Sequence, residues 1–172
     1  MVVKSSTSVD LFENIFENCL MNASGVYCRL GKEINELILS DCGGIISKSC
    51  SINKRNGNPE PRYYENNMGT LNSMGLPNEG YEFYMDKIGK FNKPYVISVA
   101  GNYLLNEFTI LREINKKMLI KKSKIMVEIN VSCPNISGKE QLAYNFPDLD
   151  FFLSLLLNTH NNHYKFSNLI IG

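Results

Sequence analysis

The chain lacks most of the features that identify metal proteins, disulfide-rich proteins and nucleic-acid binders. It has only two histidines, His160 and His163, and its five cysteines include no C-x-x-C pair. An odd number of cysteines at irregular spacing favours reduced thiols over a disulfide framework and argues against a zinc site, so we expect no metal. The net charge of +1 gives no reason to expect attraction toward nucleic acid or an anionic membrane.

Long hydrophobic runs are absent as well. The first ten residues are polar and lack the apolar stretch of a secretory signal, and the run Phe151–Leu157 is far shorter than the ~20 residues that span a bilayer. We therefore expect a cytoplasmic protein without membrane contact. The composition, 44% hydrophobic and 20% charged in 172 residues, is typical of a globular protein that can bury a core. No repeat or linker divides the chain, which predicts a single domain over residues 1–172.

Two hydrophobic periodicities alternate along the chain. Apolar residues three or four apart predict helices over 33–39, 81–88, 106–118 and 147–157. Apolar, largely β-branched runs predict strands over 45–48, 95–101, 125–131 and 169–172. We expect Gly43-Gly44 to close the first helix. Alternating helices and nearly continuous apolar strands indicate an α/β fold with a parallel sheet covered by helices.

Residues 49–78 show neither periodicity, and we expect them to form a long irregular loop. A compact domain rarely leaves so many residues without structure unless they have a function. The second part of the loop, Leu71–Asn78, places small and amide residues directly before the helix over 81–88. Backbone N–H groups exposed there can hold a carboxylate.

Polar side chains follow the predicted strand over 125–131. The sequence Asn130-Val131-Ser132-Cys133-Pro134-Asn135 carries two carboxamides, a hydroxyl and a thiol. Barrels and open α/β sheets place their chemistry at such C-terminal strand ends. An isolated cysteine is more often a buried structural residue, so a functional interpretation of Cys133 depends on the motifs that accompany it.

Four motifs occur in an order and spacing that resemble one enzyme family. They are Met21–Val26, Lys48-Ser49, Asn72–Asn78 and Asn130–Asn135. Together they resemble dihydroorotate dehydrogenase, and the continuation Gly138–Phe146 resembles its cytosolic, fumarate-using class. The membrane-bound class, which uses quinone, has a serine at the position of Cys133.

The resemblance implies a (β/α)₈ TIM barrel, of which this chain would form the first half, truncated after about four β/α units. It also implies an FMN cofactor and the oxidation of dihydroorotate to orotate in pyrimidine biosynthesis, with fumarate reduced to succinate. By resemblance, Cys133 is the base that removes a proton from the ring carbon beside a carbonyl, which a thiol can do only as thiolate. Members of this class are dimers, so a homodimer is expected.

The same resemblance implies two overlapping sets of binding residues. Substrate contacts are expected from Lys48, Asn72, Ser73, Met74, Gly75, Leu76, Asn130 and Asn135. Flavin contacts are expected from Ala23, Ser24, Gly25, Lys48, Ser49 and Asn130. Carboxamides suit a planar ligand that offers donors and acceptors, and glycine permits close approach of backbone to ligand. Taken singly, such asparagines are also typical of turns and such a lysine of a protein surface.

The sequence stops within what would be the fourth barrel strand, before the family's second flavin-contacting lysine and its glycine-rich phosphate grip. We therefore expect a truncated chain or incomplete gene product, with weak FMN binding and little turnover alone. One alternative is a catalytically inactive remnant that pairs with another chain. Another is a different FMN barrel, such as a dihydropyrimidine dehydrogenase-like module, against which the continuation Gly138–Gln141 argues.

Overall fold

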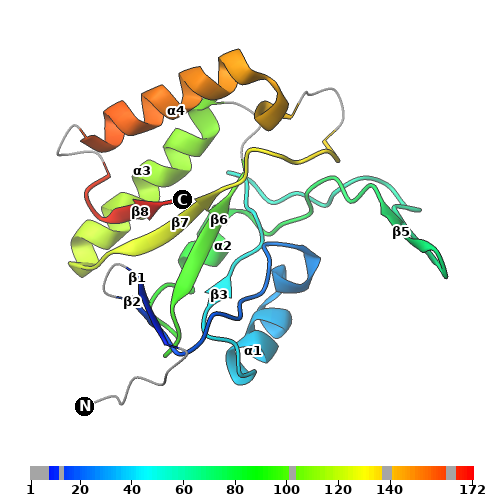
Figure 1. Ribbon diagram of the computed structural model, residues 1–172, viewed down its shortest axis with the longest axis horizontal. Coiled ribbons are helices and arrows are strands. Elements are labelled where there is room, and N and C mark those ends of the chain that lie inside the picture. The colour runs from blue at the N-terminus through cyan, green and yellow to red at the C-terminus, as the bar shows by residue number, and fades with distance from the viewer. Residues whose placement is uncertain (1–7, 12–13, 101–103, 137–140, 162–165) are drawn as a thin grey trace.

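A four-stranded parallel sheet lies at the centre of the molecule (Figure 1). The computed structural model describes residues 8–11, 14–100, 104–136, 141–161 and 166–172. In spatial order the strands are β3 (Ile45–Ile46), β6 (Tyr95–Val99), β7 (Ile125–Ile129) and β8 (Leu169–Ile171). All three pairings are parallel, and helices occur between the strands along the chain, which confirms the predicted α/β fold.

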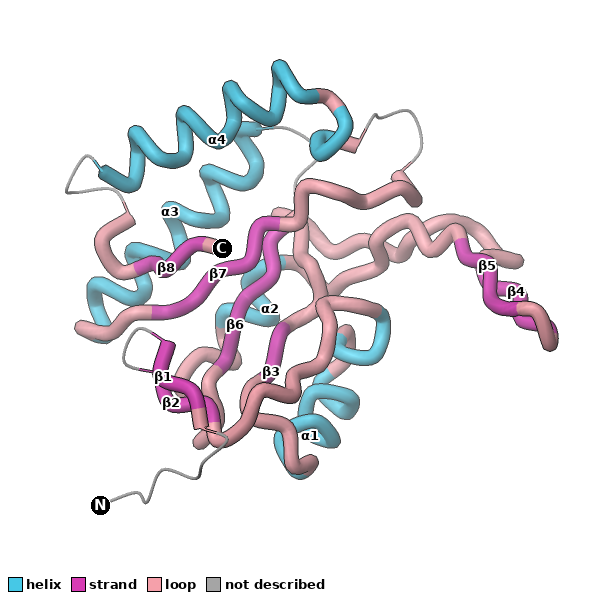
Figure 2. Tube along the Cα trace, in the orientation of Figure 1, coloured by secondary structure: helices cyan, strands magenta, loops and turns pink. Residues whose placement is uncertain are grey.

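Helices cover one face of this sheet (Figures 1 and 2). They are α1 (Gly31–Leu39), α2 (Tyr81–Met85), α3 (Leu104–Lys121) and α4 (Phe146–Asn161), with 3₁₀ turns at Val26–Cys28 and Leu142–Tyr144. Within the part of the chain that the structure describes, none of them combines the length and the apolar composition needed to cross a membrane.

Helix α1 begins and ends for local reasons. The Glu33 carboxylate accepts hydrogen bonds from two backbone N–H groups ahead of the helix, both at 2.8 Å, and thereby satisfies donors that have no partner within it. The helix ends at Leu39. The prediction that Gly43-Gly44 closes it is wrong, because the backbone already leaves the helical conformation at Ser40. A β-carbon on Gly43 would collide with the Asn18 backbone, so this glycine permits close packing instead.

The face of the sheet beneath the helices is apolar and closed. Its buried side chains include Ile97 and Val99 from β6, Val127 from β7, Ile110, Leu111 and Ile114 from α3, and Phe152 from α4. The ring of Phe108 on α3 packs edge-on against Phe152, with centroids 5.9 Å apart, so α3 and α4 lie side by side. This burial is the main force that holds the parallel sheet to its helices.

Alternate residues of the same strands point to the opposite face. In the register of β6 and β7, Val96 lies beside Met126 and Ser98 lies beside Glu128. Since side chains alternate between faces along a strand, these four residues share the face that no helix of the described residues covers. This is the face that would line the interior of a barrel.

Two antiparallel hairpins accompany the main sheet. Strands β4 (Tyr63–Asn66) and β5 (Gly69–Asn72) pair within the segment expected to be irregular, so that expectation is wrong for this part. All eight of their residues are exposed, and the hairpin extends away from the body of the protein (Figure 2). A second hairpin, β1 (Val9–Leu11) and β2 (Asn14–Phe16), was not predicted from the sequence either.

Several predicted element limits differ from those observed. Regular β3 covers only residues 45–46 of the predicted 45–48, and regular α2 ends at Met85 rather than at residue 88. Helices α3 and α4 are longer than predicted at both ends. Residues 101–102 and 138–140, which also carried predictions, lie outside the described part of the chain.

Candidate active site

A bulge directly after β3 places two predicted site residues beside the uncovered face. The N–H of Ser47 donates to the Val96 carbonyl, and the N–H of Cys50 donates to the Ser98 carbonyl, each at 2.9 Å. The two donors, Ser47 and Cys50, are three residues apart, whereas their acceptors on β6 are two residues apart. Bulges re-aim side chains and are common beside functional sites. Here the extra residue lies within the Lys48-Ser49 pair.

Lys48 is a buried cation with one hydrogen-bond acceptor among the described residues. Its side chain is 7% exposed, and Nζ donates to the carbonyl of Ser24 at 2.9 Å. Burial lowers the pKa of Lys48, while the thiols of Cys28 and Cys133 act in the opposite direction. Cys133 is therefore close enough to Lys48 to interact with it electrostatically. An ammonium with so few partners can bind an anionic or carbonyl oxygen of a ligand.

The carboxamide of Asn130 links this strand end to the loop that carries Cys133. Its Nδ2 donates to Ser49 Oγ at 3.0 Å, and its Oδ1 accepts the backbone N–H of Ser132 at 3.0 Å. The Ser132 hydroxyl in turn donates to Gln141 Oε1 at 2.7 Å. Cys133, half-buried, thus lies in a loop fixed on both sides.

The two asparagine-rich loops meet. Asn135 Nδ2 donates to Asn72 Oδ1 at 2.8 Å. Asn58 donates from Nδ2 to the Ser73 carbonyl and hydroxyl at 2.9 and 3.0 Å and to the Asn135 carbonyl at 3.3 Å. Asn58 therefore holds both loops in one position. The polar ends of Asn72 and Asn135 stay accessible for a ligand that can replace the bond between them.

The backbone of the segment Met74–Leu76 is shaped as a cradle. Gly75 and Leu76 both have positive φ values, +72° and +55°, and a β-carbon on Gly75 would overlap Asn58. Among the described residues, no hydrogen bond engages the N–H groups of Met74, Gly75 or Leu76. Free N–H groups in a tight turn form a concave site for an anion such as a carboxylate.

The segment 21–28 covers the outer edge of β3. Asn22 pairs with both backbone groups of Ile46, at 2.8 and 3.0 Å, and the Cys28 carbonyl accepts the N–H of Lys48 at 3.2 Å. This places the exposed residues Ala23 and Gly25 next to Lys48, on either side of its partner Ser24. Gly25 has open space where a β-carbon would be, so a ligand can approach its backbone.

Four residues that the sequence interpretation missed support this arrangement: Asn58, Arg62, Ser98 and Glu128. Arg62 Nη1 donates to the Asn56 carbonyl at 2.7 Å and so orders the loop that contains Asn58. Glu128 could have been noticed, since it is the only ionisable residue in the apolar strand 125–131. The functions of Asn58 and Ser98 depend on cross-strand and cross-loop partners, which a single sequence does not reveal.

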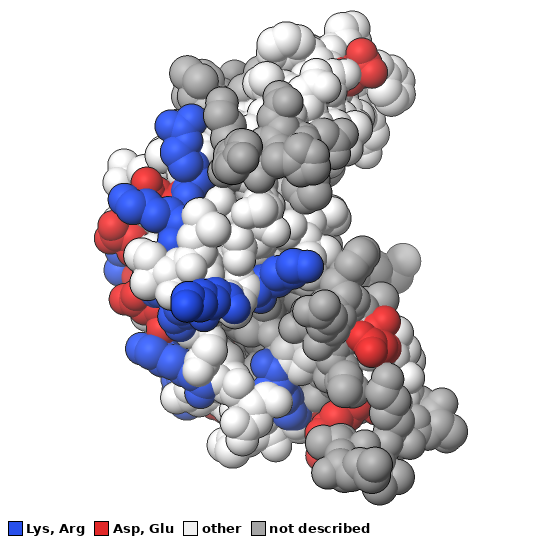
Figure 3. All heavy atoms as spheres, turned by 90° about the vertical axis from the view of Figure 1, so that its left-hand side faces the viewer, with Lys and Arg blue, Asp and Glu red and all other residues white. Residues whose placement is uncertain are grey.

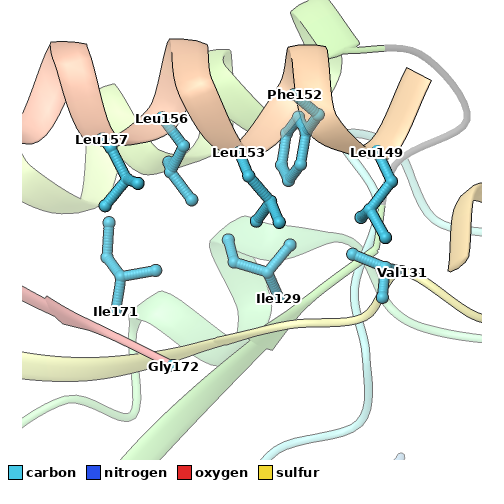
Figure 4. Close-up of a pocket in the computed structure, with 9 residues that line it drawn as sticks. All are labelled: Ile129, Val131, Leu149, Phe152, Leu153, Leu156, Leu157, Ile171 and Gly172. Carbon is cyan, nitrogen blue, oxygen red and sulfur yellow. The ribbon is translucent and has the colours of Figure 1, made fainter. Parts of the chain in front are cut away.

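A separate groove of about 520 Å³ lies between α4 and the ends of β7 and β8 (Figure 4). Its lining is apolar and includes Ile129, Val131, Leu153, Leu157 and Ile171. Leu153 and Leu157 are 43% and 59% exposed. This groove holds none of the predicted site residues. Among the described residues no cluster of side chains has the makeup of a metal site.

Comparison with known proteins gives a consistent result. Residues 6–163 match the sequence profile of a family described as dihydroorotate dehydrogenase. The dihydroorotate dehydrogenase (fumarate) of the yeast Lachancea kluyveri is 40% identical over 150 residues, which cover 84% of this chain and 46% of the relative. A relative from Streptococcus pyogenes serotype M1 is 39% identical over 157 residues, covering 88% of this chain and 49% of the relative. The chain thus spans about half the length of these curated relatives.

A solved structure supports the fold. The dihydroorotate dehydrogenase of Eimeria tenella, in complex with ferulenol, superposes with a TM-score of 0.59 at 13% sequence identity. The match covers 90% of this chain and 45% of that one. At this identity the likeness concerns the fold alone, and it agrees with the predicted half of a barrel.

Proposed function

Because the chain belongs to the dihydroorotate dehydrogenase family, we propose that it carries the substrate-facing half of an FMN-dependent enzyme that oxidises (S)-dihydroorotate to orotate in pyrimidine biosynthesis, with fumarate as electron acceptor. The observation that carries the proposal is the convergence of Lys48, the Asn130 loop and the Asn72 loop at one end of the sheet. The activity of the whole protein is proposed rather than shown, because the chain spans only about half the length of its relatives.

The chain's residues fit part of an FMN site. The accessible backbone at Ala23, Ser24 and Gly25, the Lys48 ammonium and the Asn130 carboxamide would meet the polar edge of a flavin ring. Ser49, predicted as a flavin contact, is fully buried and bonds Asn130, so it would hold this carboxamide instead. When bound, FMN supplies the hydride acceptor. The sequence has no glycine-rich loop after these residues that could hold the phosphate, so weak FMN binding by this chain alone is proposed.

The other loop would bind the substrate. Asn72, Asn130 and Asn135 offer donors and acceptors to the ring's amide groups, and Ser73 lies beside them. The N–H groups of the Met74–Leu76 cradle and the Lys48 ammonium would hold the substrate carboxylate. Buried charge and fixed dipoles of this kind bind anions strongly because little water competes.

Cys133 would act as the base of the reaction. Its thiolate would take the proton from the substrate ring carbon beside a carbonyl. The hydrogen bonds of the Ser132 backbone and side chain would fix the position of Cys133 in its loop.

Partners and location follow from the same membership. A homodimer and a cytoplasmic location are proposed from the class that the motifs resemble, and residues 1–172 are proposed to form one domain. The exposed β4–β5 hairpin, with Tyr64 at 61% and Leu71 at 73% exposure, supports contact with a second subunit. The net charge of +1 supports the proposal that the protein does not bind nucleic acid. On the face in Figure 3, lysine and arginine side chains lie among uncharged and acidic ones.

A second candidate is an inactive remnant of the family that depends on another chain. The open groove beside α4 favours it, because exposed leucines such as Leu153 and Leu157 suit burial against further structure. In this case the site residues would be present without turnover.

An assay of dihydroorotate oxidation with FMN and fumarate distinguishes the two candidates. Residues 1–172 would be tested alone and together with the second half of the Lachancea kluyveri relative. We expect little turnover alone and clear turnover in the mixture, reduced at least a hundredfold by Cys133→Ala. The matched control Cys42→Ala, at the opposite end of the sheet, should keep full activity. Absence of turnover from a folded, flavin-containing mixture would contradict the proposal and favour the remnant.

A further inference from the structure

Four hydrogen bonds form a continuous chain from a carboxylate on β7 to the loop of Cys133. Glu128 Oε1 accepts from Ser98 Oγ at 2.6 Å, and Ser98 Oγ lies 2.9 Å from Ser49 Oγ. Asn130 Nδ2 donates to Ser49 Oγ at 3.0 Å, and Asn130 Oδ1 accepts the Ser132 N–H at 3.0 Å. Residue 132 directly precedes Cys133.

The donor and acceptor properties of these groups fix which group donates in each of the four hydrogen bonds. An ionised carboxylate only accepts hydrogen bonds, so the Ser98 hydroxyl must donate its single hydrogen to Glu128. Ser98 Oγ can then only accept, which makes Ser49 the donor in the bond between the two hydroxyls. Because Ser49 has used its hydrogen, it must accept from Asn130, and the carboxamide must turn its NH₂ group toward Ser49.

This orientation leaves Asn130 Oδ1 facing the backbone N–H of Ser132. The reverse orientation would turn an NH₂ group toward that N–H, which would leave two donors facing each other. The charge on Glu128 therefore selects the rotamer of Asn130 that stabilises the loop.

The middle of the chain is shielded from solvent. Ser49 and Ser98 are both fully buried, so water does not compete for their hydroxyl groups. Hydrogen bonds in such an environment polarise one another and are costly to leave unmade. The bulge after β3 is what brings Ser49 within reach of Ser98. The centre of the network is therefore part of the buried structure of the protein and not a set of surface contacts.

We propose that Glu128 is a positioning residue for Cys133, acting through Ser98, Ser49 and Asn130. It touches neither substrate nor cofactor in this proposal. Its carboxylate holds the Asn130 carboxamide in the orientation that fixes the Ser132–Cys133 backbone. The functional meaning of the network rests on the proposed role of Cys133, whereas the network itself can be measured without any turnover.

Amide hydrogen exchange at Ser132 in the ¹⁵N-labelled chain of 172 residues tests the proposal directly. We expect Ser98→Ala to accelerate exchange of the Ser132 N–H by about tenfold, the loss of roughly one hydrogen bond. Ser98→Thr keeps the hydroxyl and should restore slow exchange. Glu128→Gln, which can accept or donate, should give an intermediate rate. The control Asp86→Asn removes a carboxylate that bonds Lys117 on α3 and should leave Ser132 unchanged.

Two results would overturn the proposal. One is an unchanged Ser132 exchange rate in both Ser98→Ala and Glu128→Gln. The other is acceleration of all sheet amides by the same factor, which would make the network merely structural. Should Ser98→Ala fail to fold, the near-isosteric Glu128→Gln decides by the same criterion. Altered exchange at Ser132 in a chain that never supports dihydroorotate oxidation would keep the positioning role and refute the proposed function.

Discussion

On β6, Ile97 and Val99 point toward the helices, whereas Ser98 between them points to the opposite face. On β7 the same alternation separates Val127 from Glu128. The first face is apolar and closed by helices, and the second carries hydroxyl and carboxylate groups joined by hydrogen bonds. Successive residues of one strand therefore serve stability and chemistry separately, because a strand reverses its side-chain direction at every step.

This comparison predicts that substitutions on the two faces have different consequences. On the helix-covered face they should change the free energy of unfolding. On the other face they should change ligand binding and local loop order while the fold persists.

The largest effect is expected from a cavity on the covered face. Ile97→Ala removes a fully buried side chain from the centre of the sheet and should lower the free energy of unfolding by about 2–5 kcal/mol. Urea unfolding followed by circular dichroism measures this. Ile120→Ala is the matched control: its side chain is 78% exposed, so the change should stay within about 0.5 kcal/mol. Equal losses in the two variants would contradict the assignment of the faces.

A pH titration of stability tests the burial of Cys50, which belongs to the core cluster. Burial raises the pKa of the Cys50 thiol to about 12, above the ordinary value of about 8.5. The unfolded chain therefore loses this proton first, and stability that is fully present below pH 8.5 is lost as pH rises toward 12. Burial raises the pKa of Cys28 to about 12 as well, so both thiols contribute.

The corresponding variant is Cys50→Ala, which should reduce the slope of unfolding free energy against pH above 8.5 without abolishing it. Cys19→Ala, at an exposed thiol, should leave the slope unchanged. A slope that is the same in all three proteins would show that Cys50 is not buried as described.

A substitution at Gly75 tests the Met74–Leu76 segment, which is proposed to hold the substrate carboxylate. Gly75→Ala places a β-carbon at φ +72° and against Asn58, at a conformational cost of about 1–2 kcal/mol. Because Asn58 holds both loops, we expect about a tenfold loss of orotate affinity by calorimetry, together with a fall of roughly 2–8 °C in the thermal midpoint. Gly31→Ala on α1, where a β-carbon meets only ordinary contacts, should bind orotate like the unsubstituted chain.

Much of the fold follows from the sequence, and the reasons for the failures are specific. The parallel sheet was predicted because its strands are continuous apolar runs between amphipathic helices. The β4–β5 hairpin was missed because all its residues are exposed and show no apolar alternation that marks a half-buried strand. The shortening of β3 was missed because the bulge depends on hydrogen bonds to β6, which lie far away in sequence.

The candidate site was predictable as a set of motifs but not as a connected structure. The resemblance named Lys48, Asn72 and Asn130, and the membership of the chain in this family is confirmed. Their individual roles stay predictions. Asn58 and Glu128 act through partners on other strands and loops, so only the structure connects them to the named residues. Sequence motifs identify groups that meet a ligand more readily than groups that hold those residues in place.

The central claim is that Lys48, the Asn72 loop and the Cys133 loop face one ligand. A titration of the ¹⁵N-labelled chain with orotate, followed by nuclear magnetic resonance, tests it most directly. The account predicts that the side-chain amide signals of Asn72, Asn130 and Asn135 and the backbone signal of Cys133 shift together with one dissociation constant. Shifts confined to one loop, or located instead around the apolar groove beside α4, would contradict it.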